Sequence, residues 1–233
     1  MNIVITGCSQ GIGREIALLF GKERDNKIVG ITRNKKALDE IVRILSPEIF
    51  KGIQYDINSI FNNSQPLLND IKKHFNVVDI LINNAGRLVN KKFIDSEIEE
   101  GRSTFETNFF APSELIRLLV PLMGVKNRSH IVNIASMAGF QGSEKYLGLS
   151  WYSASKAALA CLTECLSVEL HDYNIAVNCL ALGSVQTEML SNAFPDYKAP
   201  LAASEMAEYI VNFANTGQKV FNGKIIPVAL SNP

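Results

Sequence analysis

The chain has 233 residues, enough for one sizeable α/β domain or two small ones. Its 23 basic and 23 acidic side chains cancel, so no global field attracts nucleic acid or an anionic membrane, and we expect neither as a partner. The longest apolar stretches fall well short of the roughly 18 residues that span a bilayer, and an apolar strand pattern begins at once, without a signal sequence. We therefore expect a cytoplasmic protein.

The four cysteines give little sign of a special role. Cys8, Cys161, Cys165 and Cys179 form no Cys-x-x-Cys pair, and the chain has only 3 histidines to join them. Cys161 and Cys165 would share one face of a helix, which is compatible with a metal site, but small apolar core residues are the better interpretation. The expectation is reduced thiols and no metal.

The chain opens on a predicted strand over residues 3–5, a glycine-rich turn over 6–13, and a helix that ends near residue 20. Glycines allow a tight turn and close approach of the backbone to a pyrophosphate, while the free amides of a helix N-terminus favour an anion. A plain turn is the alternative interpretation, because a lone Gly-rich loop is weak evidence. The candidate nucleotide contacts are Gly7, Ser9, Gly11, Ile12 and Gly13.

A second strand is predicted over residues 27–32, and Arg33 follows it. In dinucleotide-binding folds this position meets the adenosine ribose, where a carboxylate would bind the free 2′-hydroxyl and an arginine would accommodate a 2′-phosphate. A guanidinium suits a phosphate well, so NADP(H) is favoured over NAD(H). Arg33 as a solvated surface residue is the alternative, and Lys35 or Lys36 could share the phosphate.

The next elements supply further candidate contacts. A helix through residue 45 leads to a strand near 53–57, where Asp56 could accept from an adenine amino group or simply cap a turn. A helix near 66–75 and a buried strand over 77–82 follow. That strand stops at Asn83. The small residues Ala85 and Gly86 that follow the amides permit packing against a flat ligand, although an ordinary turn is equally compatible.

The second half begins with a long predicted helix over 98–123, carrying Asn108 and possible kinks at Pro112 and Pro121. A fifth strand over 131–135 delivers Ser136. The helix that starts at Tyr152 and continues to about residue 173 is apolar around most of its circumference, which suggests burial on two sides and contact with a second subunit.

The remaining elements are a strand over 175–181, a loop with Val185 and Thr187, a cover over 188–203, a helix through 214 and a strand over 224–228. This alternation predicts a single α/β domain over residues 1–233. We expect a Rossmann-like, doubly wound fold, with about seven parallel strands and helices on both faces. All candidate contacts named so far that follow a strand would line one crevice at the carboxyl ends of the strands.

Tyr152 and Lys156 are the strongest catalytic candidates. On a helix, positions four apart share a face, so the phenol and the ammonium would project into the same space. Proton transfer by a tyrosine near neutral pH asks for a pKa lowered by roughly three units, about 4 kcal/mol, and a fixed cation is one way to supply it. Ser136 could present its hydroxyl to a substrate carbonyl beside them. A chance Tyr-x-x-x-Lys is the alternative for the motif taken alone.

The ordered set of motifs resembles the short-chain dehydrogenases/reductases across essentially the whole chain. The matching stretches are Thr6-Gly7-x-x-x-Gly11-Ile12-Gly13, Asn83-Asn84-Ala85-Gly86, Asn108, Ser136 and Tyr152-x-x-x-Lys156. The resemblance implies that Tyr152 transfers the proton and Ser136 orients the substrate oxygen. It also implies that Lys156 lowers the tyrosine pKa and binds the nicotinamide ribose, and that Asn108 holds a water connecting Lys156 to solvent. Val185 and Thr187 would contact the nicotinamide, and a homo-oligomer, tetramer or dimer, would form through two long helices.

Three features depart from the family pattern. The interval between Ser136 and Tyr152 is a few residues longer than usual, Leu182 replaces the usual proline before Gly183, and the chain end at residues 227–230 lacks the usual acidic-Gly-Gly sequence. The resemblance implies an NADP(H)-dependent carbonyl reductase or alcohol dehydrogenase acting on a small-molecule carbonyl or alcohol. A redox-neutral epimerase or dehydratase with bound nicotinamide, or a dinucleotide-sensing module without catalysis, are the alternatives. Candidate walls of the substrate pocket, or ordinary packing residues, are Phe140, Tyr146, Trp151, Phe194 and Tyr197.

Overall fold

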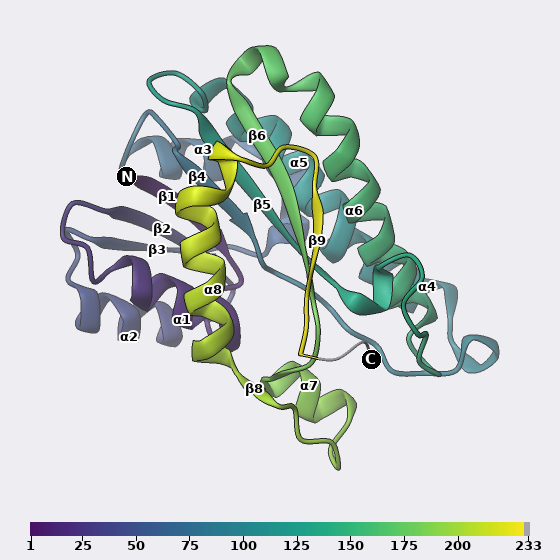
Figure 1. The fold of residues 1–233 in the computed structure, drawn as a ribbon. Coiled ribbons are helices and arrows are strands. Elements are labelled where there is room, and N and C mark those ends of the chain that lie inside the picture. The colour runs from purple at the N-terminus through teal and green to yellow at the C-terminus, as the bar shows by residue number, and fades with distance from the viewer. Residues whose placement is uncertain (231–233) are drawn as a thin grey trace.

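The computed structural model describes residues 1–230, which form a seven-stranded sheet with helices on both faces (Figure 1). The strand order is β3-β2-β1-β4-β5-β6-β9, and every pairing is parallel. The strands are β1 Asn2–Thr6, β2 Lys27–Thr32, β3 Phe50–Gln54, β4 Ile80–Asn83, β5 Ser129–Ser136, β6 Ile175–Leu182 and β9 Ile225–Val228. The predicted fold class is confirmed.

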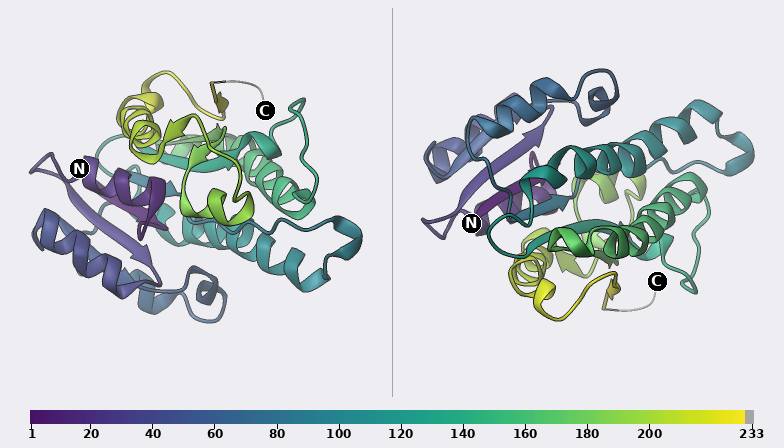
Figure 2. Two further views of the ribbon diagram at one scale, coloured as in Figure 1. Left: turned by 90° about the horizontal axis from the view of Figure 1, so that it is seen from below. Right: turned by 90° about the horizontal axis from the view of Figure 1, so that it is seen from above.

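Two helical layers enclose the sheet, as the views from below and above show (Figure 2). On one face lie α1 Gly11–Phe20, α2 Lys35–Leu45 and α8 Ala203–Thr216, which share a core cluster with β1, β4 and β5. On the other lie α3 Gln65–Lys72, α5 Ala111–Leu119 and α6 Ser150–Glu169. Because the central strands are covered on both sides, they carry nearly continuous apolar runs, and β6 is buried along its whole length.

The strand order reverses between β1 and β4, and this reversal positions the site. The crossover after β1 leads to β2 on one side, whereas β4 lies on the other side of β1 and continues the sheet toward β5. The connections at the carboxyl ends of β1 and β4 therefore diverge and leave a crevice between them. Ligands of open parallel sheets bind at such a point.

Two predicted elements differ from those observed. The third strand ends at Gln54, so Asp56 lies beyond it; its side chain accepts from the Asn58 amide at 3.1 Å and caps a 3-10 turn over Ile57–Phe61. The helix predicted over 98–123 is divided into α4 Ile98–Phe105, a π-helical turn over Glu106–Phe110 and α5. Pro112 lies in the first turn of α5, directly after the π-helical turn, which is where the sequence predicted a kink.

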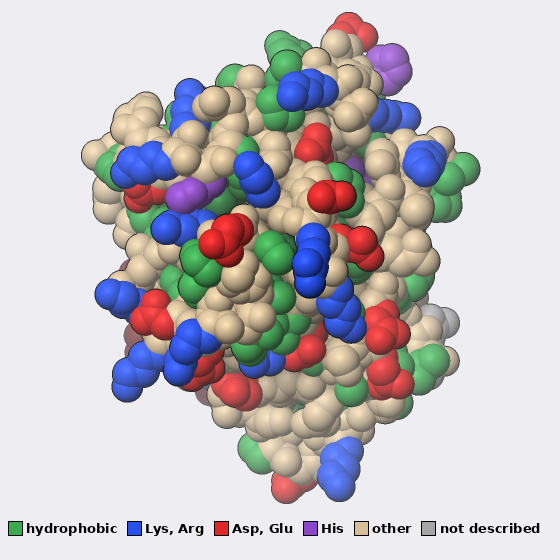
Figure 3. Space-filling model, turned by 90° about the vertical axis from the view of Figure 1, so that its left-hand side faces the viewer, with side chains coloured by type: hydrophobic (Ala, Val, Ile, Leu, Met, Phe, Trp, Pro, Cys, Tyr) green, Lys and Arg blue, Asp and Glu red, His purple; other side chains and the backbone are tan. Residues whose placement is uncertain are grey.

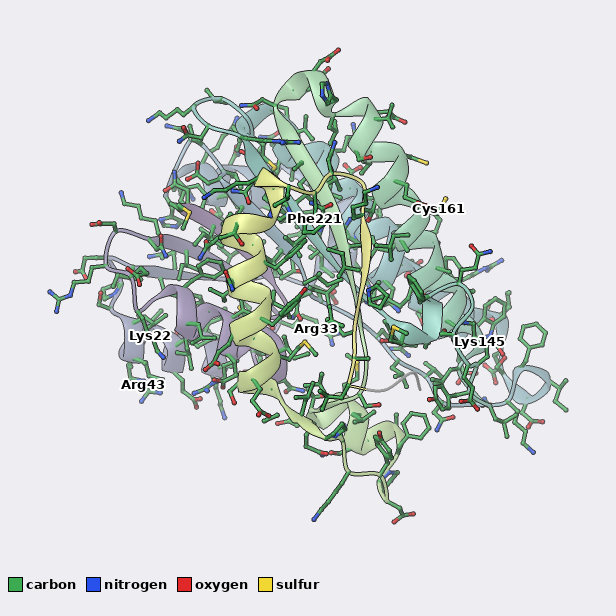
Figure 4. The ribbon with its side chains drawn as sticks, viewed as in Figure 1. Lys22, Arg33, Arg43, Lys145, Cys161 and Phe221 are labelled. Atoms are coloured by element: carbon green, nitrogen blue, oxygen red, sulfur yellow. The ribbon has the colours of Figure 1, made fainter. Side chains whose placement is uncertain are left out.

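The helix α6 is buried along one side only in the single chain. Cys161 and Cys165, which were predicted to be core residues, are exposed, and Val168 on the same side is 77% exposed, whereas Cys8 and Cys179 lie in the core. Figure 4 shows the Cys161 side chain pointing away from the sheet. The apolar character of α6 therefore exceeds what packing on its own sheet requires.

The surface carries charges of both signs. On the side shown in Figure 3, Lys and Arg side chains are interspersed with Asp and Glu. Among residues 1–230, no helix combines the length and apolar character that a membrane crossing requires. Within the same range, no three His, Cys, Asp or Glu side chains gather as they would around a metal ion.

A buried histidine makes the stability of the fold sensitive to acid. His130 in β5 is fully buried; its Nδ1 donates to the Ala214 carbonyl oxygen at 3.0 Å, and its Nε2 accepts from Asn178 Nδ2 at 3.0 Å. Burial, assisted slightly by the charge of Arg128, lowers the pKa of His130 from 6.5 to about 4. The unfolded chain thus binds this proton at a higher pH than the folded chain does.

We expect this histidine to contribute about 3 kcal/mol of stability that is present above about pH 6.5 and lost as the pH falls toward about 4. Urea unfolding of the wild type and of a His130→Asn variant at several pH values measures the effect. The variant should be less stable near neutrality, because it leaves polar partners unpaired, and the difference between the two proteins should shrink in acid. A difference that stays constant with pH would contradict the assignment.

Candidate active site

A cavity of about 1150 Å³ opens at the carboxyl ends of the strands. It exceeds the roughly 300–1,000 Å³ of a pocket for one small ligand, so it has room for a dinucleotide and a substrate together. It brings together most of the predicted site residues, and those in its lining are Gly7, Ser9, Gly11, Ile12, Gly13, Arg33, Asp56, Ala85, Gly86, Ser136, Tyr152, Lys156, Val185 and Thr187.

The glycine-rich turn between β1 and α1 forms one wall of this cavity. Gly7 and Gly11 have φ of 70° and 55°, in the left-handed region that favours glycine. A Cβ at Gly13 would collide with the Gly7 carbonyl oxygen and the Asn84 side chain. The turn can therefore close only with glycine at this position, and it leaves the first amides of α1 facing the cavity, where an anion is favoured.

Arg33 and Asp56 lie together at the adenosine end of the predicted site. Their charged groups are 3.8 Å apart, and the Arg33 side chain is 77% exposed. The position of the Arg33 side chain can be followed in Figure 4, where it is labelled. An ion pair this exposed contributes little to stability. The guanidinium is therefore free to bind a phosphate group at the cavity edge.

Ser136, Tyr152 and Lys156 meet at the other end of the cavity. Ser136 ends β5, and its Oγ accepts from the Ala138 amide at 3.2 Å, which leaves its own proton to interact with the Tyr152 phenol or with a substrate oxygen. Lys156 Nζ lies 5.9 Å from the centre of the Tyr152 ring and donates to the Ile134 carbonyl oxygen at 2.8 Å. The helical spacing thus places phenol and ammonium on the same side, as predicted.

The electrostatics of this group differ from the sequence prediction. Burial raises the pKa of Tyr152 above 10, and the interaction with the Ser136 side chain, which lowers it, is smaller. Burial also lowers the pKa of Lys156 from 10.5 to about 8. A lowered tyrosine pKa was expected from the neighbouring cation, but burial of the phenol decides the direction of the shift, and the opposing interaction comes from Ser136 and not from Lys156, whose ammonium is directed at the Ile134 carbonyl oxygen.

Asn108 lies behind the cavity wall, fully buried in the π-helical turn. Its Oδ1 accepts from the Arg87 amide at 2.7 Å, and its Nδ2 donates to the Arg87 carbonyl oxygen at 2.8 Å and to Ser155 Oγ at 2.9 Å. Ser155 Oγ donates in turn to the Tyr152 carbonyl oxygen at 2.7 Å. Asn108 therefore joins the chain after Gly86 to the first turns of α6, and single-turn π-helices often occur at such functional positions.

Asn83 requires a correction as a predicted ligand contact. It is 3% exposed and donates from Nδ2 to Asn133 Oδ1 at 2.8 Å, inside the sheet, so it does not line the cavity. Its neighbour Asn84, at the next position of the alternating strand, faces the cavity and donates to the carbonyl oxygens of Thr6 and Gly7, at 3.1 Å each. The two adjacent asparagines at the strand end indicated a ligand contact, but the sequence does not show which of the two side chains faces the cavity.

Two departures from the family pattern have structural explanations. The residues after Ser136 form a 3-10 turn over Met137–Gly139 and a loop that folds outward before α6, so the longer interval leaves Ser136 and Tyr152 beside the same cavity. Leu182 extends β6 by one residue and pairs with Ser136 on one side and Val228 on the other. A leucine there has the amide proton that proline lacks.

Beyond the predicted residues, the cavity wall includes side chains that the sequence did not single out, namely Gln10, Tyr55, Arg87, Asn90, Ser184 and Met189. Of the predicted pocket aromatics, Tyr146, Phe194 and Tyr197 line the cavity, whereas Phe140 and Trp151 do not. Trp151 instead packs on Phe93 with ring centres 5.3 Å apart and donates to Ser96 Oγ at 2.9 Å. Nothing in the sequence distinguishes an aromatic residue that lines the cavity from one that packs against other side chains.

Comparison with known proteins gives a consistent result. A family model described as short chain dehydrogenase matches residues 1–198. An uncharacterized oxidoreductase of Staphylococcus aureus (strain USA300) is 29% identical over 225 residues, which cover 97% of this chain and 95% of that protein. The dehydrogenase/reductase SDR family member 7B of Mus musculus is 33% identical over 196 residues, which cover 82% of this chain and 59% of that protein.

Solved structures resemble the whole chain. A short-chain dehydrogenase/reductase described as glucose/ribitol dehydrogenase, from Brucella melitensis, has a TM-score of 0.87 at 27% identity and covers 98% of this chain and 94% of its own. One of unknown function from Caenorhabditis elegans, determined with cofactor, has a TM-score of 0.86 at 23% identity, with 98% and 93% covered. At that identity the second likeness shows the fold alone.

Proposed function

The chain belongs to the short-chain dehydrogenase/reductase family of oxidoreductases, and from that premise we propose that it is an NADP(H)-dependent carbonyl reductase or alcohol dehydrogenase. The observation that carries the proposal is the convergence of Ser136, Tyr152 and Lys156 at one end of a cavity whose other wall is the glycine-rich turn. The tyrosine, which can give up and take back a proton, thus faces the space where a nicotinamide and a substrate would meet.

The residues present fit a dinucleotide. The turn over Gly7 to Gly13 has no side chain where the backbone would approach a pyrophosphate, and the amides of α1 face that space. Arg33 would hold a ribose 2′-phosphate and Asp56 the adenine amino group, while Val185 and Thr187 would contact the nicotinamide and Lys156 its ribose. The nicotinamide, when bound, supplies the hydride that is exchanged with the substrate carbon.

The protein side of a ketone reduction needs a proton for the substrate oxygen. Tyr152 supplies it from its phenol, which the raised pKa keeps protonated at neutral pH. Ser136, whose Oγ is held by the Ala138 amide beside the Tyr152 phenol, donates a hydrogen bond to the same oxygen and orients it. Lys156 carries the charge that stabilises the phenolate left behind, and Asn108 holds the backbone after Gly86 and the start of α6 at a fixed spacing.

The cofactor preference provides a direct test at Arg33. We expect the wild type to oxidise NADPH in preference to NADH with a carbonyl substrate, and an Arg33→Glu variant to reverse the preference. The reason is that a carboxylate repels a 2′-phosphate and accepts from a free 2′-hydroxyl. Losing one charge-assisted phosphate contact should lower kcat/KM for NADPH by roughly 10-fold to 100-fold. The matched control is Arg43→Glu, which makes the same charge change on α2 outside the cavity.

The same assay decides between the proposed function and its alternatives. Loss of the near-ultraviolet absorbance of the reduced nicotinamide during turnover supports net reduction, and a constant absorbance with product formation would indicate a redox-neutral isomerisation or dehydration. Cofactor binding without turnover of any ketone, aldehyde or secondary alcohol would indicate a dinucleotide sensor. An unchanged NADPH/NADH ratio in the Arg33 variant would contradict the role given to that residue alone.

We further propose that the enzyme works in the cytoplasm as a homo-oligomer, a dimer or tetramer. All four cysteines are free thiols, as is usual in a reducing compartment. The outward side of α6 exposes Ala157, Cys161 and Val168, an apolar surface that a second copy would cover. Light scattering on the purified protein gives the oligomer mass, and a monomer at micromolar concentration would contradict this part of the proposal.

A further inference from the structure

Three segments are joined by hydrogen bonds into a collar around the substrate end of the cavity. The collar comprises residues 87–91 after β4, the loop 140–149 before α6, and residues 187–200, which include α7 Glu188–Ala193 and most of the cover predicted over 188–203. The Lys91 amide donates to the Gly148 carbonyl oxygen at 3.0 Å, and Asn90 Nδ2 donates to the Ala193 carbonyl oxygen at 2.8 Å. Asn90 fits at this junction because Gly148 has φ of 86° and a Cβ there would collide with its side chain.

The loop 140–149 contains the residues by which the interval before Tyr152 exceeds the family pattern, and it is braced internally. Ser143 Oγ donates to the carbonyl oxygens of Met137 and Phe140, and Lys145 Nζ donates to the Phe140 carbonyl oxygen at 2.7 Å. Figure 4 shows Lys145 beside the end of α6 where the helix begins. Tyr146 follows this brace directly and lines the cavity. The longer loop therefore provides part of the cavity wall.

The cover provides a further part of the cavity wall and is fixed at its base. β7 Val185–Gln186 pairs with β8 Leu201–Ala202 across its two ends. The Gln186 side chain binds both halves of the cover, donating to Ser191 Oγ at 2.9 Å and accepting from the Ala199 amide at 2.9 Å. Tyr197 lines the cavity from this cover and lies near Tyr146, whose pKa is raised by burial, then by the Glu144 charge, and least by Tyr197.

The chemistry of the collar favours flat apolar groups over ions. Most of its cavity-lining side chains are apolar or aromatic, namely Leu88, Tyr146, Leu149, Met189, Leu190, Ala193, Phe194 and Tyr197. The charged ones, Arg87 and Glu188, are both exposed and opposite in sign, so they offer no net attraction to an anion or a cation. Tyr146 and Tyr197 are 40% and 46% exposed in the protein alone, which leaves their ring surfaces available to a ligand.

We propose that Tyr146 and Tyr197 form an aromatic clamp that grips a flat apolar ring next to the reacting carbon, so that aryl ketones and the corresponding aryl alcohols are the preferred substrates. The inference rests on the proposed reductase function and adds the substrate class. An aromatic ligand in offset or edge-on contact with a tyrosine ring gains more binding free energy than the burial of its apolar area alone provides. A small aliphatic ketone reaches Tyr152 without touching the clamp and gains nothing from it.

Acetophenone and acetone, with NADPH, are the probes. We expect Tyr146→Ala and Tyr197→Ala each to raise KM for acetophenone by about fivefold to tenfold and to leave kcat and the KM for acetone within about twofold. The Kd of acetophenone for the enzyme with NADP⁺ bound, measured by calorimetry, should rise by the same factor. Leu147→Ala is the matched control, because it shortens the neighbouring side chain, which is 76% exposed and outside the cavity lining.

The outcomes separate the clamp from the reductase proposal. If the wild type turns over neither probe nor any other ketone, aldehyde or secondary alcohol, the reductase function fails, whereas the calorimetric Kd still tests the clamp. Equal Kd and KM values for acetophenone in the wild type and both alanine variants would overturn the clamp, as would equal losses for acetone, or no binding of acetophenone by the wild type. Tyr146→Phe, which keeps the ring, should retain the wild-type values, and its failure to do so would also count against ring contact.

Discussion

A Tyr152→Phe variant should lose nearly all turnover while binding NADPH as the wild type does. The substitution removes one oxygen atom from a ring that stays in place, so the cavity keeps its shape. What disappears is the group that protonates the substrate oxygen, and positioned proton transfer contributes roughly 10²–10⁴-fold to rate. We expect kcat with a ketone substrate to fall within that range and the Kd of NADPH to change by less than about twofold.

Neither of the other two side chains that meet at this end of the cavity can replace the Tyr152 phenol as the proton donor. Ser136 lines the same cavity, but an aliphatic hydroxyl is too weak an acid to give up its proton, and Lys156 directs Nζ at the Ile134 carbonyl oxygen. Tyr173→Phe is the matched control, because it makes the same chemical change at a tyrosine that is 59% exposed and outside the cavity lining. Retention of more than about a tenth of wild-type kcat by the Tyr152 variant would remove this residue from the mechanism.

The sequence was sufficient for the features that depend on local order along the chain. Alternating strands and helices predict parallel pairing, and a turn with glycine at positions 7, 11 and 13 between a strand and a helix predicts an anion cradle. The structure adds that Gly13 admits no side chain. The spacing of four residues likewise predicted that Tyr152 and Lys156 would lie on the same side of one helix, because helical geometry alone decides which side chains share a face.

Features that depend on long-range contacts were not accessible. Whether Asn83 or Asn84 faces the cavity depends on the register of β4 against β5, where Asn83 pairs with Asn133. The role of Asn108 depends on a π-helical turn that brings it to Arg87. The position of Tyr146 depends on a loop fixed through Lys91. The direction of the Tyr152 pKa shift followed from burial, which no pattern of neighbouring charges reveals.

Replacing Lys156 by methionine should be the next most damaging single change. The ammonium lies 5.9 Å from the centre of the Tyr152 ring. The separation from the phenolate oxygen sets the size of the effect: with an effective dielectric constant of about 20, a unit charge roughly 6 Å from a phenolate stabilises it by about 3 kcal/mol, which corresponds to a rate factor on the order of 10². Methionine has nearly the same length and fills the buried space without a charge. We expect kcat/KM for alcohol oxidation near neutral pH to fall by roughly that factor.

The pH profile distinguishes an electrostatic role from simple packing. Because burial lowers the pKa of Lys156 to about 8, its charge is present below that pH and is lost as the pH rises through it. Alcohol oxidation by the wild type should therefore rise with pH as the phenolate fraction grows and then level off above about pH 8, because loss of the ammonium charge offsets the further ionisation of a phenol whose pKa is raised. The methionine variant should continue to rise through pH 8, and a Lys156→Arg variant, charged at every accessible pH, should do so too while retaining more activity. A levelling near pH 8 that persists in the methionine variant would assign it to another group, and Lys156 would then act by position alone.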